Sequence, residues 1–290
     1  MLGLIGTITN QAILSGVVLP PIPTPEPPDL DNLYGWWSPR YGHVQDVGAG
    51  TVSSWLDQVS DKAFAVSGSR PMFYRASGSD AGFISHSFMN SSAGPTGSSP
   101  TVEWQTLVHT SSLLPSDTDG LIKDCPITIA FTFRNNGTVQ NHGWLSACRR
   151  YGSLDPDQLD ENGDWGWTLK NQIGGAPRFS SNVNTANPTG YHGNNIVGIW
   201  ILQLDAASGG DWYLYQNDWE TAMMGPLTYG TTLEAGMISF PGRAVSNDTR
   251  IPTLPCDISE ILIYTSSLSE SDRHDLYNYM TASISGTGGF

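Results

Sequence analysis

The stretch from Asp257 to Ile284 constrains the fold most, because its hydrophobic pattern changes from strand to helix within one short turn. Its first part alternates with a period of two, which places Ile258, Glu260, Leu262 and Tyr264 on one face of a predicted strand. The opposite face is also apolar. We therefore expect this strand to lie between two layers of the protein.

A single helix is predicted to follow this strand. Ser269 and Asp272 have the spacing of a capping box, and acidic residues are favoured in a first helical turn by the helix dipole. Leu276, Met280 and Ile284 then recur at helical spacing. The rest of the chain is expected to form the sheet on which this amphipathic helix packs.

Short segments with strand patterns fill the chain from about residue 31, separated by connections rich in Gly, Pro, Ser and Asn. They are residues 33–37, 51–57, 62–66, 70–74, 82–88, 101–108, 126–133, 144–148, 165–169, 196–205, 211–217, 236–240 and 256–264. The 32 glycines and 19 prolines suit a β protein with many loops. The pattern predicts an all-β sandwich or jelly roll over residues 31–290, with one C-terminal helix.

Residues 1–30 are predicted to form an extended N-terminal arm outside that domain. Six prolines between Pro20 and Pro28 enforce a stiff polyproline II spacer. The preceding segment is too apolar for a solvated tail, which is the alternative, and it lacks the basic region of a secretory signal. We expect it to become ordered on a partner, with anchoring residues Leu2, Leu4, Ile5, Ile8, Ile13 and Leu14.

The charge of the chain narrows the choice of partners. Its net charge is −14, which argues against binding to nucleic acid phosphates and to anionic membrane surfaces. No apolar run reaches the ~20 residues needed to span a bilayer. The three cysteines are too few for a disulfide framework and are expected to be free thiols of a protein made in a reducing cytoplasm.

Several motifs resemble, in their order, those of the concanavalin A-like (LamG-type) jelly-roll domains. They are Leu33-Tyr-Gly-Trp-Trp37, Val52-Ser-Ser-Trp-Leu-Asp57, Arg70-Pro71, Ile127–Phe133, and Ile258–Tyr264 followed by Leu268–Leu276. The resemblance covers about residues 31–285 and is closest to bacteriophage virion proteins. It implies a jelly-roll domain and a structural role in the virion, as a head decoration, a fibre or a tail spike component made in the host cytoplasm. The arm would then dock onto other capsid or tail proteins, and the jelly roll would be exposed.

Sequence motifs for catalysis are absent. The chain has no Glu-x-Asp-x-x-Glu run of jelly-roll glucanases, no Gly-x-Ser-x-Gly and no His-Glu-x-x-His. Asp257 and Glu260 come nearest to that run, but they are an odd number of residues apart and face opposite sides of a strand. Asp218 and Glu220 share a face, but they follow the end of a strand and read more simply as solvated loop acids. The sequence therefore predicts a protein that is not an enzyme. A stand-alone, lectin-like carbohydrate-binding module is the alternative, and a glycan hydrolase that uses Asp218 and Glu220 ranks last.

Four tryptophans are candidates for binding glycan, such as a host polysaccharide, because an indole face can stack on the apolar surface of a sugar ring. They are Trp165, Trp167, Trp212 and Trp219. The competing interpretation is that these rings fill the core, and it is favoured for Trp165 and Trp167. Trp219 lies between two acidic residues, which favours exposure.

An acidic loop offers the only predicted metal site, and no other cofactor is expected. Its oxygen ligands suit Ca²⁺, and they are Asp155, Asp157, Asp160, Asn162 and Asp164. The spacing differs from that of an EF-hand, so an ordinary acidic hairpin loop is the favoured interpretation and calcium the alternative. A spike would also assemble as a homo-oligomer, although no heptad or repeat in the chain marks one.

Overall fold

A computed structural model of the 290-residue chain defines the fold. The structure describes residues 26–28, 31–39, 43–45, 51–59, 63–67, 72–74, 83–86, 106–109, 126–135, 143–148, 165–171, 177–181, 185–186, 197–205, 211–228, 237–240 and 256–285. All structural statements below concern these residues.

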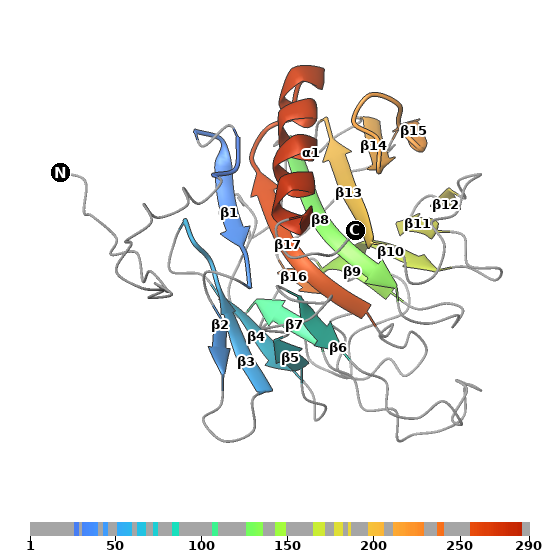
Figure 1. Cartoon of the computed structure of the whole chain (residues 1–290). Helices are drawn as coiled ribbons and strands as arrows, with labels where there is room; N and C mark the ends of the chain where they lie inside the picture. Colours follow the sequence, from blue (N-terminus) through green and yellow to red (C-terminus); the bar gives the residue numbers. More distant parts are fainter. Residues whose placement is uncertain are drawn as a thin grey trace, which may run out of the picture.

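The described residues form antiparallel strands and one helix (Figure 1). The strands are β1 (Leu33–Trp37), β2 (His43–Gln45), β3 (Thr51–Leu56), β4 (Ala63–Ser67), β5 (Met72–Tyr74), β6 (Ile84–His86), β7 (Thr106–His109), β8 (Ile127–Asn135), β9 (Gly143–Cys148), β10 (Trp165–Asn171), β11 (Pro177–Ser181), β12 (Thr185–Ala186), β13 (Val197–Leu204), β14 (Asp211–Gln216), β15 (Met224–Thr228), β16 (Met237–Phe240) and β17 (Cys256–Tyr264). The helix is α1 (Glu270–Ser285). The predicted all-β sandwich with one C-terminal helix is confirmed.

Two runs of paired strands make up the sandwich. The first run has the order β15–β14–β13–β8–β17–β1, and the second has the order β3–β4–β7–β16–β9–β10–β11. Strand β6 pairs with both β17 and β5, and β5 pairs with β3, so β6 and β5 link the two runs. Helix α1 lies over the first run, with β1 on one side and β14 on the other (Figure 1).

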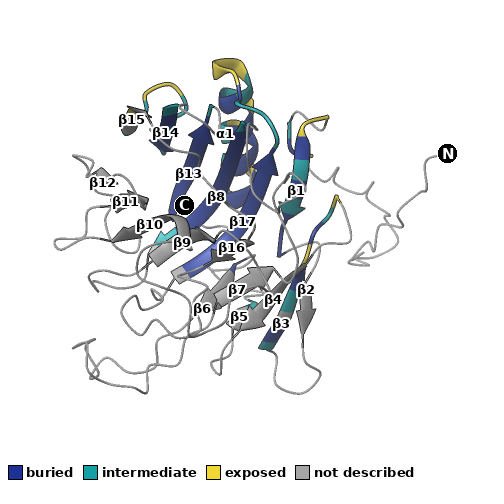
Figure 2. Cartoon of the chain, turned by 180° about the vertical axis from the view of Figure 1, so that it is seen from behind, coloured by how far each residue is buried: buried dark blue, intermediate teal, exposed yellow. Residues whose placement is uncertain are grey.

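The centre of the first run is buried on both faces. Strand β13 is buried along its whole length (Figure 2). Ile127–Phe133 of the neighbouring strand β8 are also buried, and so are Asp257–Tyr264 of β17 on the other side of β8. On the inner face, the rings of Phe131 and Trp200 stack with centroids 6.2 Å apart. On the outer face, α1 supplies the cover. These strands are therefore near-continuous apolar runs, because neither face meets water.

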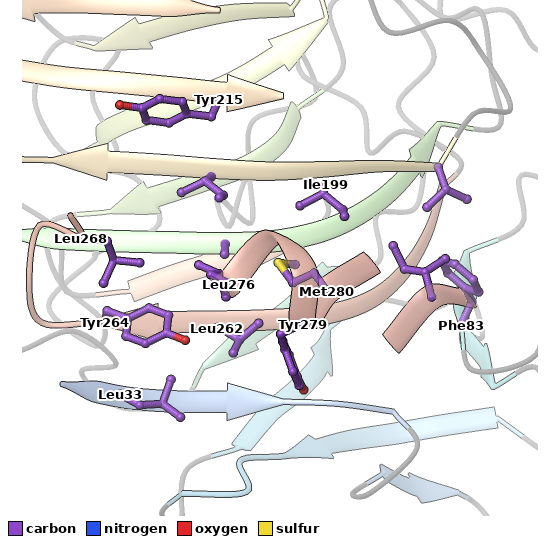
Figure 3. Packing of buried hydrophobic residues seen from close by; sticks show 14 residues of the cluster. Leu33, Phe83, Ile199, Tyr215, Leu262, Tyr264, Leu268, Leu276, Tyr279 and Met280 are labelled. Carbon is purple, nitrogen blue, oxygen red and sulfur yellow. The ribbon is translucent and has the colours of Figure 1, made fainter. Parts of the chain in front are cut away.

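Helix α1 begins at the predicted capping box. The Asp272 backbone N–H donates to Ser269 Oγ at 3.2 Å, and the Ser269 backbone N–H donates to Asp272 Oδ2 at 3.2 Å. The predicted apolar stripe faces the sheet, as Figure 3 shows. Leu276, Met280 and Ile284 are each fully buried against the outer face of the first run.

Strand β17 departs from the predicted alternation at a β-bulge. Ile258 pairs with Phe133 and Ile261 pairs with Phe131, so two residues of β17 stand opposite one residue of β8. Directly paired residues point to the same face, which places Ile258 on the inner face. The prediction that Ile258 shares a face with Leu262 is therefore wrong. Glu260 keeps its predicted outer face, where the Tyr279 hydroxyl donates to its Oε1 at 3.3 Å.

Two polar contacts hold β1 and the chain before it onto the sheet. Asp57 is buried, and its Oδ1 accepts from the backbone N–H of Trp36 at 2.7 Å and of Val59 at 3.0 Å. The Tyr264 hydroxyl donates to the Pro28 carbonyl at 3.1 Å, and Pro27 is buried. The described end of the proline-rich spacer thus rests on the domain. The rest of the arm, with its six predicted anchoring residues, lies outside the described residues.

No helix in the described part of the chain is both long enough and apolar enough to span a bilayer.

Replacement of Gly35 by Ala is expected to destabilise the protein by about 1–3 kcal/mol, because the new Cβ would overlap the fully buried ring of Trp37. The free energy of unfolding from urea titration measures this effect. Val59→Ala truncates a side chain that is 46% exposed and serves as the control, with an expected change below about 0.5 kcal/mol. Equal stabilities of the two variants would contradict the close packing of the Trp37 ring on Gly35.

Candidate functional site

A tight loop between β14 and β15 places Trp219 beside the N-terminal half of α1. Asn217 has a φ of 50°, a left-handed conformation that Asn tolerates well, and its Oδ1 accepts from the Ile199 backbone N–H at 2.8 Å. Asp218 Oδ1 accepts from the backbone N–H of Glu220 at 2.8 Å and of Thr221 at 3.1 Å. These side-chain caps fix the backbone of residues 217–221.

Trp219 and His274 form the exposed centre of the site. Their ring centroids lie 4.4 Å apart with an interplanar angle of 51°, and both residues are half-buried. The two rings therefore meet at an angle, and each keeps part of its surface open to solvent. We call Trp219 and His274, together with Arg273, Tyr213 and Tyr215, the Trp219 cluster.

Arg273, on the buried side of α1, connects the helix to the loop that carries Trp219. Its Nε donates to the Trp219 carbonyl at 3.0 Å and its Nη1 donates to the Leu268 carbonyl at 2.9 Å. The guanidinium carbon lies 4.6 Å from the ring centroid of Tyr215, which is a cation–π distance. Arg273 is 9% exposed, so these contacts are shielded from water. Its positive charge therefore interacts mainly with the two carbonyls and the tyrosine ring.

The two tyrosines of β14 extend the cluster along the sheet. Their rings stack with centroids 6.4 Å apart. Burial raises the pKa of the Tyr213 phenol, and the carboxylates of Asp205 and Asp211 raise that pKa further. Burial also raises the pKa of Tyr215, although the Arg273 charge acts in the opposite direction. Both phenols therefore stay protonated to a higher pH than a free tyrosine, and each keeps a hydroxyl donor.

Carboxylates border the cluster on both elements. Asp218 and Glu220 flank Trp219 in the sequence, and Glu270 lies one helical turn before His274. Asp275 Oδ1 is 3.9 Å from His274 Nδ1, but the His274 side chain is 45% exposed and the Asp275 side chain 63% exposed, so water screens that pair. The surface around Trp219 therefore combines aromatic rings with hydrogen-bond acceptors.

The structure tests only some of the residues predicted to bind glycan. Trp219 is half-buried, whereas the sequence favoured exposure, and its binding of glycan stays a prediction. Trp212 is 2% exposed, because the alternation of β14 turns it to the inner face while Tyr213 and Tyr215 face α1. The prediction that Trp212 offers its ring to a sugar is therefore wrong. Trp165 and Trp167 lie in β10, and their side chains are outside the described part of the structure.

The predicted calcium loop, residues 155–164, also lies outside the described residues. Within the described residues, no group of three or more His, Cys, Asp or Glu side chains could hold a metal ion. The calcium site stays a prediction. The carboxylate pair proposed for a hydrolase is described, and one member, Asp218, holds the loop backbone.

Arg273 and His274 belong to this site but were not predicted from the sequence to be part of it. Arg273 falls on the apolar stripe of α1, three and seven residues before Leu276 and Met280. A charged residue in the buried stripe of a helix needs a partner, and that position was the available signal. The neighbour of His274, Trp219, is 55 residues away in the sequence (274 − 219), so helix periodicity alone cannot reveal the contact.

Comparisons with known proteins place the fold but give no family. No protein-family model matches the chain, and no curated protein matches it. Solved structures do match. A mutant of Trypanosoma rangeli sialidase that displays trans-sialidase activity aligns over 88% of this chain and 34% of its own, with a TM-score of 0.55 and 14% identity. This chain thus spans about a third of the length of that sialidase.

Two further matches are named as single domains of larger proteins. Domain 4 of AbnA, a GH43 extracellular arabinanase from Geobacillus stearothermophilus solved with arabinotriose, aligns over 85% of this chain and 98% of its own, with a TM-score of 0.51 and 11% identity. The binding domain of botulinum neurotoxin DC, solved with rat synaptotagmin II, aligns over 86% and 52% respectively, with a TM-score of 0.50 and 11% identity. These matches are consistent with a concanavalin A-like jelly roll.

The matches correct one prediction. The sequence predicted that the chain is not an enzyme, but the first structural matches are chains of sialidases, which are enzymes. The prediction rested on missing catalytic motifs, and this fold occurs within catalytic proteins. The prediction that the chain is not an enzyme is therefore contradicted and is withdrawn.

Arg273→Met is expected to lower the free energy of unfolding by about 1.5–3 kcal/mol, because it keeps the apolar stem but removes charge-assisted hydrogen bonds to two main-chain carbonyls. Urea unfolding measures the change. Arg273→Lys retains the charge without the two-pronged geometry and should fall between the variant and the wild type. Wild-type stability in Arg273→Met would show that the hydrogen bonds of Arg273 to the Trp219 and Leu268 carbonyls do not stabilise the fold.

The raised pKa of Tyr215 predicts a loss of stability at high pH. Its folded pKa lies above the ordinary value of 10.0, so its contribution is complete below pH 10 and disappears as the pH rises through the folded pKa. Tyr215→Phe removes the titrating group and should flatten the decline in unfolding free energy above pH 10. Urea unfolding between pH 8 and pH 11 tests this, and an unchanged pH profile in the variant would refute it.

Proposed function

We propose that this protein is a carbohydrate-binding β-sandwich module. The observation that carries the proposal is the match to an isolated arabinanase domain over 98% of that domain, because that domain was solved with arabinotriose. The match to sialidases, which covers about a third of their chains, supports a module of proteins that act on sugars. At these low identities the likeness concerns the fold, so the binding residues must come from this chain itself.

The Trp219 cluster is the place we propose for the sugar. A sugar ring has apolar C–H faces and a rim of hydroxyls. A half-buried indole and imidazole can pack against the C–H face. Carboxylates such as Glu220 accept hydrogen bonds from hydroxyls, and a protonated Tyr213 can donate one. Arg273 fixes the Trp219 backbone before binding, which lowers the entropy lost when the ligand is held.

Trp219→Ala is expected to weaken binding to arabinotriose, or to the best ligand of a glycan array, by about fivefold or more through loss of stacking. The main-chain contact of Trp219 with Arg273 does not depend on the side chain, so the fold should persist. Calorimetric titration measures the affinity. Trp219→Phe should retain part of it, and Val59→Ala should retain all of it. Full affinity in Trp219→Ala would show that the sugar does not bind at Trp219, and Trp165 and Trp167 would be the next candidates.

The narrower role predicted from the sequence is a virion component whose arm, residues 1–30, docks onto other virion proteins. It stays a prediction and is compatible with sugar binding, since an exposed module on a particle could recognise a host polysaccharide. The described contact between Pro28 and Tyr264 gives the arm a fixed point of departure from the domain.

A further inference from the structure

The charges around the Trp219 cluster bear on which sugars it would take, and the inference rests on the function proposed above. Seven carboxylates lie on the elements that form or border the cluster. They are Asp205, Asp211, Asp218, Glu220, Glu270, Asp272 and Asp275. In residues 205–228 and 256–285, Arg273 is the only lysine or arginine.

The positive charge of Arg273 is not offered to a ligand. Its guanidinium is buried, donates to the carbonyls of Trp219 and Leu268, and lies over the Tyr215 ring. A carboxylate-bearing sugar would therefore meet no free guanidinium or ammonium in the described part of this surface. It would meet Glu220, which is exposed and directly follows Trp219, and Glu270, which is exposed at the start of α1.

The pKa shifts of Tyr213 and Tyr215 also indicate a negative electrostatic potential at the cluster. The carboxylates of Asp205 and Asp211 raise the pKa of Tyr213, and those of Asp205 and Glu270 contribute to the raised pKa of Tyr215. Ionising a phenol there is disfavoured, and so is bringing any other anion. Like charges repel, and several carboxylates act together here.

We infer that the Trp219 cluster selects uncharged saccharides and excludes acidic ones such as sialic acids and uronic acids. The rings accept the apolar face of a sugar of either class. The bordering carboxylates accept hydrogen bonds from neutral hydroxyls, but they repel a ligand carboxylate. The selectivity is thus electrostatic, although the sialidases that share the fold act on an acidic sugar as complete enzymes.

The test is a glycan array that carries each neutral oligosaccharide beside its sialylated or uronic acid counterpart, with lactose and 3′-sialyllactose as the reference pair. The full chain should bind neutral members at least about tenfold more tightly than their acidic partners in 20 mM salt. The gap should narrow in 0.5 M salt, which screens exposed charges. Acidic members bound as tightly as neutral ones would overturn the inference and leave the proposed function standing.

A matched pair of variants separates this effect from the general acidity of the protein. Glu220→Gln combined with Glu270→Gln removes two exposed charges beside the cluster and should reduce the neutral-to-acidic ratio by about threefold or more. Glu26→Gln combined with Asp31→Asn removes two charges at the start of the described chain and should leave the ratio unchanged. An equal effect of both pairs of substitutions would overturn the inference that the carboxylates beside the Trp219 cluster cause the selectivity. Binding to no saccharide at all would refute the proposed function and this inference together.

Discussion

Burial of the central strands on both faces is the constraint on which the rest of the structure depends. Strands β8, β13 and β17 carry apolar side chains on both sides, so a single partner layer cannot cover them. The second run of strands covers the inner face of these three strands, and α1 covers their outer face. The helix is therefore an integral layer of the fold, and its position decides what can gather along its flanks. The Trp219 cluster exists because α1 lies beside β14.

Much of this architecture could be predicted from the sequence because its causes are local. Two-residue alternation identified most strands, and the capping box at Ser269 identified the start of α1. The bulge in β17 could not be predicted, since it depends on pairing with a strand more than a hundred residues away. Strands β2, β11, β12 and β15 were also missed. Each has few residues or weak alternation, so pairing with a neighbour defines it more than its own pattern does.

The site was only partly visible in the sequence for a related reason. Trp219 attracted attention through its acidic neighbours, whereas Trp212 looked equivalent until the phase of β14 turned its ring inward. Arg273 and His274 come from another element, and a linear pattern does not show which loop a helix will meet. The absence of known catalytic motifs was an even weaker guide to whether the chain is an enzyme. A fold shared with sialidase chains does not by itself say whether catalysis takes place.

The contact between Tyr264 and Pro28 determines how mechanical load would travel through the molecule. The chain enters the domain at the edge strand β1, and tension on its N-terminal end would otherwise act on that edge alone. The Tyr264 hydroxyl and the backbone bond from the Thr265 N–H to the Asn32 carbonyl, 3.0 Å long, tie the entering segment to the buried C-terminal end of strand β17. A pull on the N-terminal end is thereby shared with the centre of the sheet, where rupture requires many hydrogen bonds to break together.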